Sequence, residues 1–128
     1  MKFILYSLLA LGFAFTQLNA HDPATDMAFA AKRFLQSLDT ETKKKAHFLF
    51  KNIERENWHF FPGPFIRPDG RQGLSLKDMS PAQKILAHGL LGSALSHRGM
   101  IETTDVILLE QILYGREERE MRNPELYH

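Results

Sequence analysis

The stretch from Ser80 to Gly99, SPAQKILAHGLLGSALSHRG, predicts the central helix of a mainly α-helical protein. Ser80 can accept a hydrogen bond from an amide of the first turn, and Pro81 suits the first helical position. Gln83 completes a capping box with Ser80. Apolar residues follow nearly all the way round the helix, a pattern typical of deep burial. We therefore expect one buried helix that ends at Gly99, a residue suited to a C-terminal cap.

Within that stretch, Gly89 and Gly92 weaken a helix, because glycine is about 1 kcal/mol less favourable than alanine in a helix interior. Close approach of a neighbouring backbone is the simplest reason for them, and a ligand role is the alternative. The same helix would hold His88 and His97 on opposite faces, since nine residues at 3.6 per turn place them half a turn apart.

Two further principal helices are predicted, one on each side of the central one. The upstream helix opens at Asp22-Pro23 and has an apolar stripe at three- and four-residue steps. Asp39 follows and is expected to cap a short turn. The downstream helix is expected to be capped near Thr103 or Thr104 and to end at Gly115.

The first twenty residues have the layout of a secretory signal peptide: Lys2, an apolar run from Phe3 to Phe15, and a small residue at Ala20. A membrane span needs about 20 apolar residues, and the run ends too early at Thr16. We expect residues 1–20 to be cleaved near Ala20, leaving a helical domain of residues 21–128. Such a protein is exported to the periplasm or the extracellular space and keeps no stable membrane insertion. An uncleaved anchor is the alternative.

Charge and composition exclude some partners and some chemistry. The whole chain has 16 basic and 15 acidic residues, and Lys2 is the only charged residue in the leader, so the remainder is formally neutral. No nucleic-acid partner is expected, because such proteins carry basic surfaces. The chain has no cysteine, so it has neither a disulfide nor a thiolate for metal binding or nucleophilic attack.

Residues 58–79, WHFFPGPFIRPDGRQGLSLKDM, form a long segment without helical or alternating pattern. Loops of more than about 12–15 residues are uncommon in compact domains and are often functional. The aromatic residues beside fixed cations suggest a ligand-facing loop, with Trp58, His59, Arg67 and Arg71 as candidates for a small anionic ligand. The alternative is structural, with the aromatic side chains in the core under a proline-rich strap.

The order and spacing of several motifs resemble the domain of unknown function family 3500 over nearly the whole mature chain. The motifs are Phe34–Leu38, Arg55 with Trp58–Phe60, Arg71–Leu74, Asp78-Met79 with Pro81–Gln83, Ala94–Gly99, Leu109-Glu110 with Leu113, and Arg122–Tyr127. The resemblance implies a longer protein, of which this chain is the N-terminal, mostly helical part of a larger α+β fold. The missing C-terminal half would then be a partner. The family implies no activity and no cofactor.

Local motifs for catalysis or metal binding do not appear in the sequence, so whether the protein is an enzyme stays open. A copper-type site at a newly exposed His21 would need a second histidine such as His59. Arg55, Asp78 and Glu110 are candidates to support the loop. Glu110 lies beside an apolar stripe, where a half-buried acid would need Arg71, Arg98 or Trp58 as a partner, or would form a structural salt bridge.

Three functional hypotheses follow. The first is an exported binding half whose loop faces a cleft. The second is a fragment of a metal-dependent enzyme, a hydrolase or oxidase, with its other site residues beyond His128. The third is a stand-alone helical interaction module.

Overall fold

The structure is a computed structural model that describes residues 22–57 and 71–128. In these residues the protein is mainly α-helical, as predicted, and has no β-strand. The α-helices within these ranges are α2 (Pro23–Ser37), α3 (Thr40–Ala46), α4 (Pro81–Ala94) and α5 (His97–Glu117). The same ranges contain the short 3₁₀ turns η1 (Ile53–Glu56), η3 (Leu76–Asp78), η4 (Glu120–Arg122) and η5 (Pro124–Leu126). Across the described ranges, every helix is too short or too polar to span a membrane.

The helix starts that depend on local side chains form as predicted. Asp22 accepts a hydrogen bond from the Ala24 amide at 3.1 Å, with Pro23 at the first helical position. Asp39 caps α3, a full helix rather than the expected turn, by accepting from the amide of Thr42 at 2.9 Å. Such contacts join residues two or three apart, so the sequence alone specifies them.

At α4 the complete capping box is present: the Ser80 amide donates to Gln83 Oε1 at 2.8 Å, and the Gln83 amide donates to Ser80 Oγ at 3.3 Å. The Gln83 side-chain amide also donates to the backbone oxygen of Ser37 at 2.9 Å. This cap therefore fixes the start of α4 against the end of α2.

The boundary between the central and downstream helices differs from the prediction. α4 ends at Ala94, Leu95 is extended, and Ser96 caps a new helix by accepting from the Gly99 amide at 3.1 Å. Thr103 lies inside α5, where its hydroxyl donates to the backbone oxygen of Gly99 at 2.8 Å. The expected end at Gly99 and the expected start near Thr103 or Thr104 were wrong, because Ser96 starts a helix where the apolar pattern runs on.

The break between α4 and α5 also changes the expected arrangement of His88 and His97. His88 lies on α4, whereas His97 is the first residue of α5, so the argument from opposite faces of one helix does not apply.

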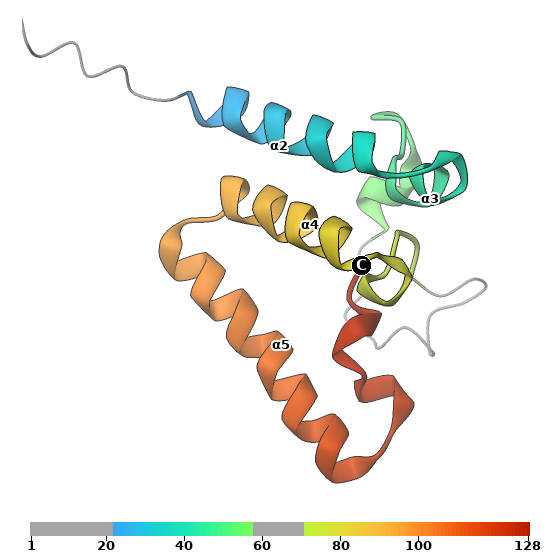
Figure 1. Cartoon of the computed structure of the whole chain (residues 1–128), viewed down its shortest axis with the longest axis vertical. Coiled ribbons are helices and arrows are strands. Elements are labelled where there is room, and N and C mark those ends of the chain that lie inside the picture. Colours follow the sequence, from blue (N-terminus) through green and yellow to red (C-terminus); the bar gives the residue numbers. More distant parts are fainter. Residues whose placement is uncertain (1–21, 58–70) are drawn as a thin grey trace, which may run out of the picture.

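Figure 1 shows α2 packed along α4; after α4 the chain reverses, and α5 diverges from α4 toward its C-terminal end. After α5 the chain turns back through η4 and η5 to the start of α4. The Leu76 amide donates to the backbone oxygen of Tyr127 at 2.9 Å, which joins η3 to the segment after η5. The result is an open triangle whose sides are α4, α5 and the returning segment.

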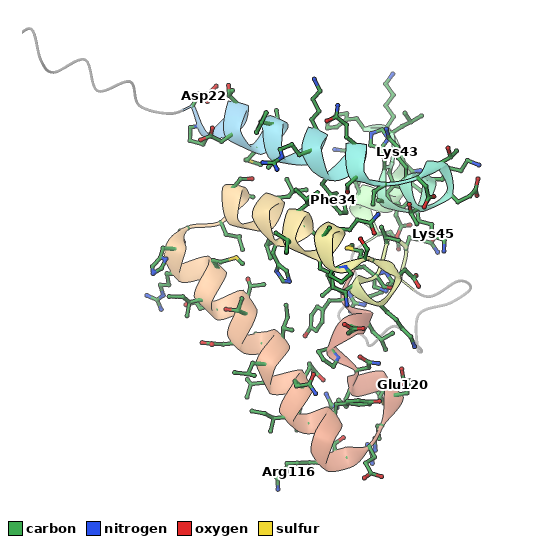
Figure 2. All side chains as sticks on the ribbon, in the orientation of Figure 1. Asp22, Phe34, Lys43, Lys45, Arg116 and Glu120 are labelled. Atoms are coloured by element: carbon green, nitrogen blue, oxygen red, sulfur yellow. The ribbon has the colours of Figure 1, made fainter. Side chains whose placement is uncertain are left out.

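The core of the described residues is small and lies between α2 and α4. Its buried members are Phe34, Leu38 and Leu74, and Figure 2 shows Phe34 pointing from α2 toward α4. The expected deep burial of α4 is wrong: none of its residues is buried, and Ile85 is 73% exposed. One apolar face of α4 packs on α2, and the rest stays open.

The two helix glycines do not mark a close approach within the described part of the chain. A Cβ atom added to Gly89 or to Gly92 would have no described neighbour within 4 Å. The expected backbone contact is therefore not present there.

Candidate functional site

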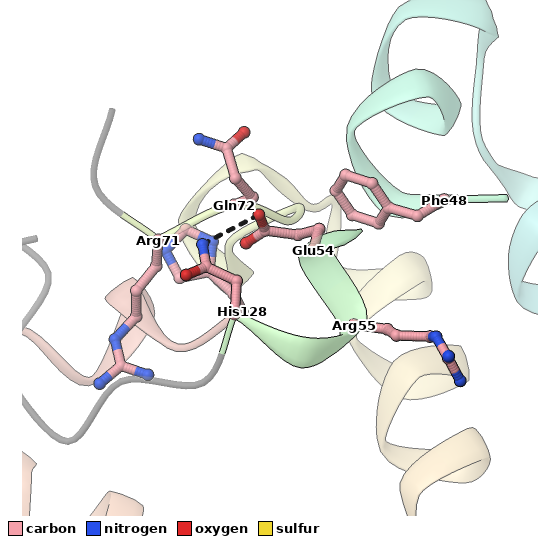
Figure 3. A pocket seen from close by; sticks show the side chains of 7 residues that line it. Phe48, Glu54, Arg55, Arg71, Gln72 and His128 are labelled. Carbon is pink, nitrogen blue, oxygen red and sulfur yellow. Dashed lines mark hydrogen bonds between the residues drawn. The ribbon is translucent and has the colours of Figure 1, made fainter. Parts of the chain in front are cut away.

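A polar pocket of about 330 Å³ lies where the two described parts of the chain meet (Figure 3). Asn57 precedes residues 58–70 and Arg71 follows them, so the pocket is built from residues before the predicted loop 58–79 and from Arg71 and Gln72 within it. Its lining residues are Phe48, Glu54, Arg55, Asn57, Arg71, Gln72 and His128. Cationic, acidic, amide and imidazole groups therefore share one space.

The two arginines of this pocket do not converge. Figure 3 shows the Arg55 and Arg71 side chains extending in opposite directions. Arg55 pairs with Glu56 at 3.0 Å, and its guanidinium lies 4.7 Å from the centre of the Phe50 ring. Arg55 is thus held on the outer side, and Arg71 is the second cation of the pocket lining.

The acid of the pocket is held by a neighbouring amide. Glu54 Oε2 accepts a hydrogen bond from Asn57 Nδ2 at 3.1 Å, the dashed contact in Figure 3. The local turn explains this contact, because η1 begins with Asn52 as its cap and places residues 54 and 57 one turn apart. Glu54 gives the pocket one fixed acceptor.

A larger groove of about 450 Å³ occupies the open triangle between α4, α5 and the returning segment. Its apolar wall comes from α2, α4, α5 and the segment around η3. The lining residues are Phe34, Ala46, Gly73, Leu74, Leu76, Met79, Ala87, His88, Leu90, Leu91, Ala94, Thr103, Ile107, Tyr127 and His128. His128 lines both this groove and the polar pocket.

Tyr127 stands at the polar edge of the groove. Partial burial raises the pKa of its phenol, the negative charge of Glu110 raises it further, and the positive charge of Arg71 lowers it. The phenol therefore stays neutral and can both donate and accept a hydrogen bond. Arg71 therefore acts electrostatically on Tyr127, a residue of the groove lining.

Glu110 has a different partner from those expected. Arg122 Nη1 lies 3.2 Å from Glu110 Oε1, and Arg122 Nε lies 3.5 Å from Glu117 Oε2. Arg98, one of the expected partners, instead pairs with Glu102 at 2.8 Å. The reason is the left-handed turn at Glu118, with φ of 52°, which folds η4 back along α5. Glu110 thus forms a structural salt bridge.

The other predicted site residues separate into two groups. Asp78 lies exposed in η3 and lines neither cavity. Trp58, His59, Arg67 and His21 lie outside the described residues, and so does the proposed copper site. The described ranges hold no group of three histidine or carboxylate side chains suited to a metal ion.

The cavity-lining residues that sequence reasoning did not name as site candidates include Glu54, Asn57, Gln72, Tyr127 and His128. Gln72 and Tyr127 belong to the motifs that carry the family resemblance, which was the available signal. Nothing local indicated that His128 returns to the middle of the chain, because that contact depends on the course of α5.

An apolar row also lies on the outer face of α5. Ile101, Leu108 and Ile112 recur at helical spacing and are about half exposed or more, with Leu108 at 57%. Glu102 and Arg98 flank the row at its start. This row faces away from the groove, which Thr103 and Ile107 line from the same helix.

In its described residues the protein is mainly helical, with a polar pocket beside an apolar groove. Residues 20–128 match the family model described as protein of unknown function (DUF3500), and the chain belongs to that family. No curated protein and no solved structure matches the chain.

Proposed function

We propose that this is an exported protein that binds a small ligand carrying a carboxylate together with a hydrogen-bond donor. The polar pocket that joins Arg71 and Gln72 to Glu54 and Asn57 is the observation that supports this proposal. Its volume lies within the range of about 300–1,000 Å³ that is usual for ligand pockets.

The mixture of charges in the pocket defines the ligand class. A guanidinium such as that of Arg71 suits a carboxylate, because it offers planar, permanently charged donors. Glu54 would repel a bare anion but would accept a hydrogen bond from a hydroxyl group of the ligand. Gln72 can supply both a hydrogen-bond donor and an acceptor to the part of the ligand between Arg71 and Glu54. A hydroxy acid satisfies these groups better than a simple carboxylate or phosphate does.

The test is a titration of the purified, isotopically labelled protein with 3-hydroxybutyrate, followed by amide chemical shifts. Binding should shift the signals of Gln72 and Asn57, and butyrate should bind more weakly because it has no hydroxyl group to donate to Glu54. Arg71→Gln should weaken binding at least about tenfold, the loss expected for a charge-assisted hydrogen bond.

Arg98→Gln is the matched control, because Arg98 is an exposed arginine that pairs with Glu102 on α5. It should bind 3-hydroxybutyrate like the unaltered protein. If the pocket signals do not respond, or if both arginine variants lose binding equally, the proposal is wrong.

Export is the second part of the proposal and is supported by the sequence of residues 1–20. Intact mass of the exported protein should correspond to a chain that begins at or near His21. Leu9→Arg, which places a charge in the apolar run, should leave uncut protein inside the cell. An exported chain that still begins at Met1 would contradict cleavage.

The interaction-module hypothesis has one observation in its favour, the exposed apolar row of α5. Ligand binding is preferred because the pocket combines specific polar groups with a concave shape, whereas the row offers apolar surface alone.

A further inference from the structure

The apolar groove has the composition of a site for a hydrocarbon chain. Leu74, Met79 and Leu90 form its floor near the core, and Ile107 forms part of the opposite wall. Polar side chains enter only at a few places: His88, Thr103, Tyr127 and His128. An apolar space with few polar groups is the usual form of a small-molecule site.

The groove lies next to the polar pocket. Arg71 and Gln72 line the pocket, and the next two residues, Gly73 and Leu74, line the groove. His128 belongs to both linings. Gly73 packs closely against His128, because an added Cβ atom would lie 3.2 Å from the Cβ of His128. The two cavities are therefore neighbours at these two residues.

We propose that the groove binds the alkyl tail of an amphipathic hydroxy acid whose carboxylate head lies in the polar pocket. This inference rests on the proposed function and adds the ligand class, a 3-hydroxyalkanoate longer than the pocket alone can hold. Charge complementarity fixes the orientation: the Arg71 cation lies at the pocket end, and the inner groove is lined by aliphatic side chains.

A chain-length series tests the tail. Titration calorimetry should compare 3-hydroxybutyrate, 3-hydroxyoctanoate and 3-hydroxydecanoate, all below the concentrations at which they aggregate. Each added methylene should tighten binding about fourfold, the factor for burying one methylene, until the groove is full. 1-Decanol, which has the tail without the carboxylate, should bind at least tenfold more weakly than 3-hydroxydecanoate.

A pair of neighbouring variants locates the tail. Ile107→Glu places a charge in the groove wall, whereas Leu108→Glu makes the same change on the exposed outer face of α5. Ile107→Glu should abolish the gain from chain length and leave 3-hydroxybutyrate binding unchanged. Leu108→Glu should change neither. Circular dichroism of both variants checks that the helices are intact, and Thr103→Glu, on the same wall, replaces Ile107→Glu if that variant does not fold.

The outcomes separate this inference from the proposed function. If 3-hydroxybutyrate binds but longer chains bind no more tightly, the groove is not a tail site and the pocket proposal stands. If 1-decanol binds as tightly as 3-hydroxydecanoate, or if Leu108→Glu removes the chain-length gain, the amphipathic site is wrong. If no hydroxy acid binds, both proposals fail.

Discussion

At the scale of single residues, Gly73 has the strictest steric requirement in the described chain. Its φ of 128° lies in a region that side-chain-bearing residues rarely adopt. It also precedes Leu74, a core residue that is 3% exposed, and contacts His128. Gly73 therefore fixes the direction of the backbone into the core, and it packs against His128 where the two cavities are neighbours.

Gly73→Ala should lower the free energy of unfolding by about 1–3 kcal/mol, the range for a residue held in an unfavourable backbone conformation. The matched control is Gly89→Ala on α4, where an added Cβ meets no described atom. That variant should be neutral or more stable by up to about 1 kcal/mol, because alanine favours helix. Urea unfolding followed by circular dichroism measures both, and equal effects at the two glycines would contradict the assignment.

Single residues also show how far the sequence can specify a site. The caps of Asp22, Asp39 and Ser80 were predictable because donor and acceptor lie within three residues of each other. The partner of Glu110 was not, because Arg122 reaches it only through the left-handed turn at Glu118. That turn uses a non-glycine residue at positive φ, a conformation that the residue type does not indicate.

At the scale of secondary-structure elements, the helix N-termini make the fold sensitive to acid. The backbone amide of Thr42 holds the pKa of Asp39 below its ordinary value, and the hydroxyl of Thr25 does the same for Asp22. A carboxylate whose pKa is lower in the folded than in the unfolded state stabilises the fold above its unfolded pKa of about 3.9. That stabilisation is lost as the pH falls through the folded-state value.

Asp39→Asn should therefore flatten the dependence of stability on pH below about pH 4, because asparagine caps a helix without titrating. The thermal midpoint, measured from pH 2.5 to 6, should fall less steeply with acid than in the unaltered protein. Asp105→Asn, on the exposed middle of α5, is the control and should keep the original slope. An unchanged slope in Asp39→Asn would show that the cap contributes nothing to acid sensitivity.

The break between α4 and α5 shows why element boundaries were harder to predict than their existence. Leu95 continues the apolar pattern, and Gly99 looks like a C-terminal residue. Ser96 nevertheless starts a new helix by accepting from the Gly99 amide. The fourth position of this cap holds glycine rather than glutamate or glutamine, so the capping-box pattern that identified Ser80 was missing.

At the scale of the whole molecule, the main packing within the described residues is between α2 and α4. Phe34 is 8% exposed and is the largest side chain of the described core. Phe29, on the same helix, is 62% exposed, and the Arg33 guanidinium lies 5.8 Å from the centre of its ring. The mainly helical class was predictable from the periodicity of such residues. The open triangle was not, because it depends on the angle at Leu95.

Phe34→Ala should destabilise the protein by about 3–5 kcal/mol, the range for removing a buried phenylalanine. Phe29→Ala should change stability by no more than about 1 kcal/mol. Chemical denaturation compares the two, and Phe34→Leu supplies a measurable value if Phe34→Ala is unfolded in buffer. If Phe34→Ala and Phe29→Ala lowered the free energy of unfolding equally, the main core would not lie around Phe34.

The position of α5 has a consequence for solvent exchange. Its outer face is exposed in the described structure, and its inner face borders the groove. Its main contacts with other described elements are with α4 and with η4 and η5, which fold back against its C-terminal half. Its central amides should therefore take up deuterium earlier than those of α2 and α4, since helices with little tertiary support open at low free energy. A ligand bound in the groove would then slow deuterium uptake by the amides of α5.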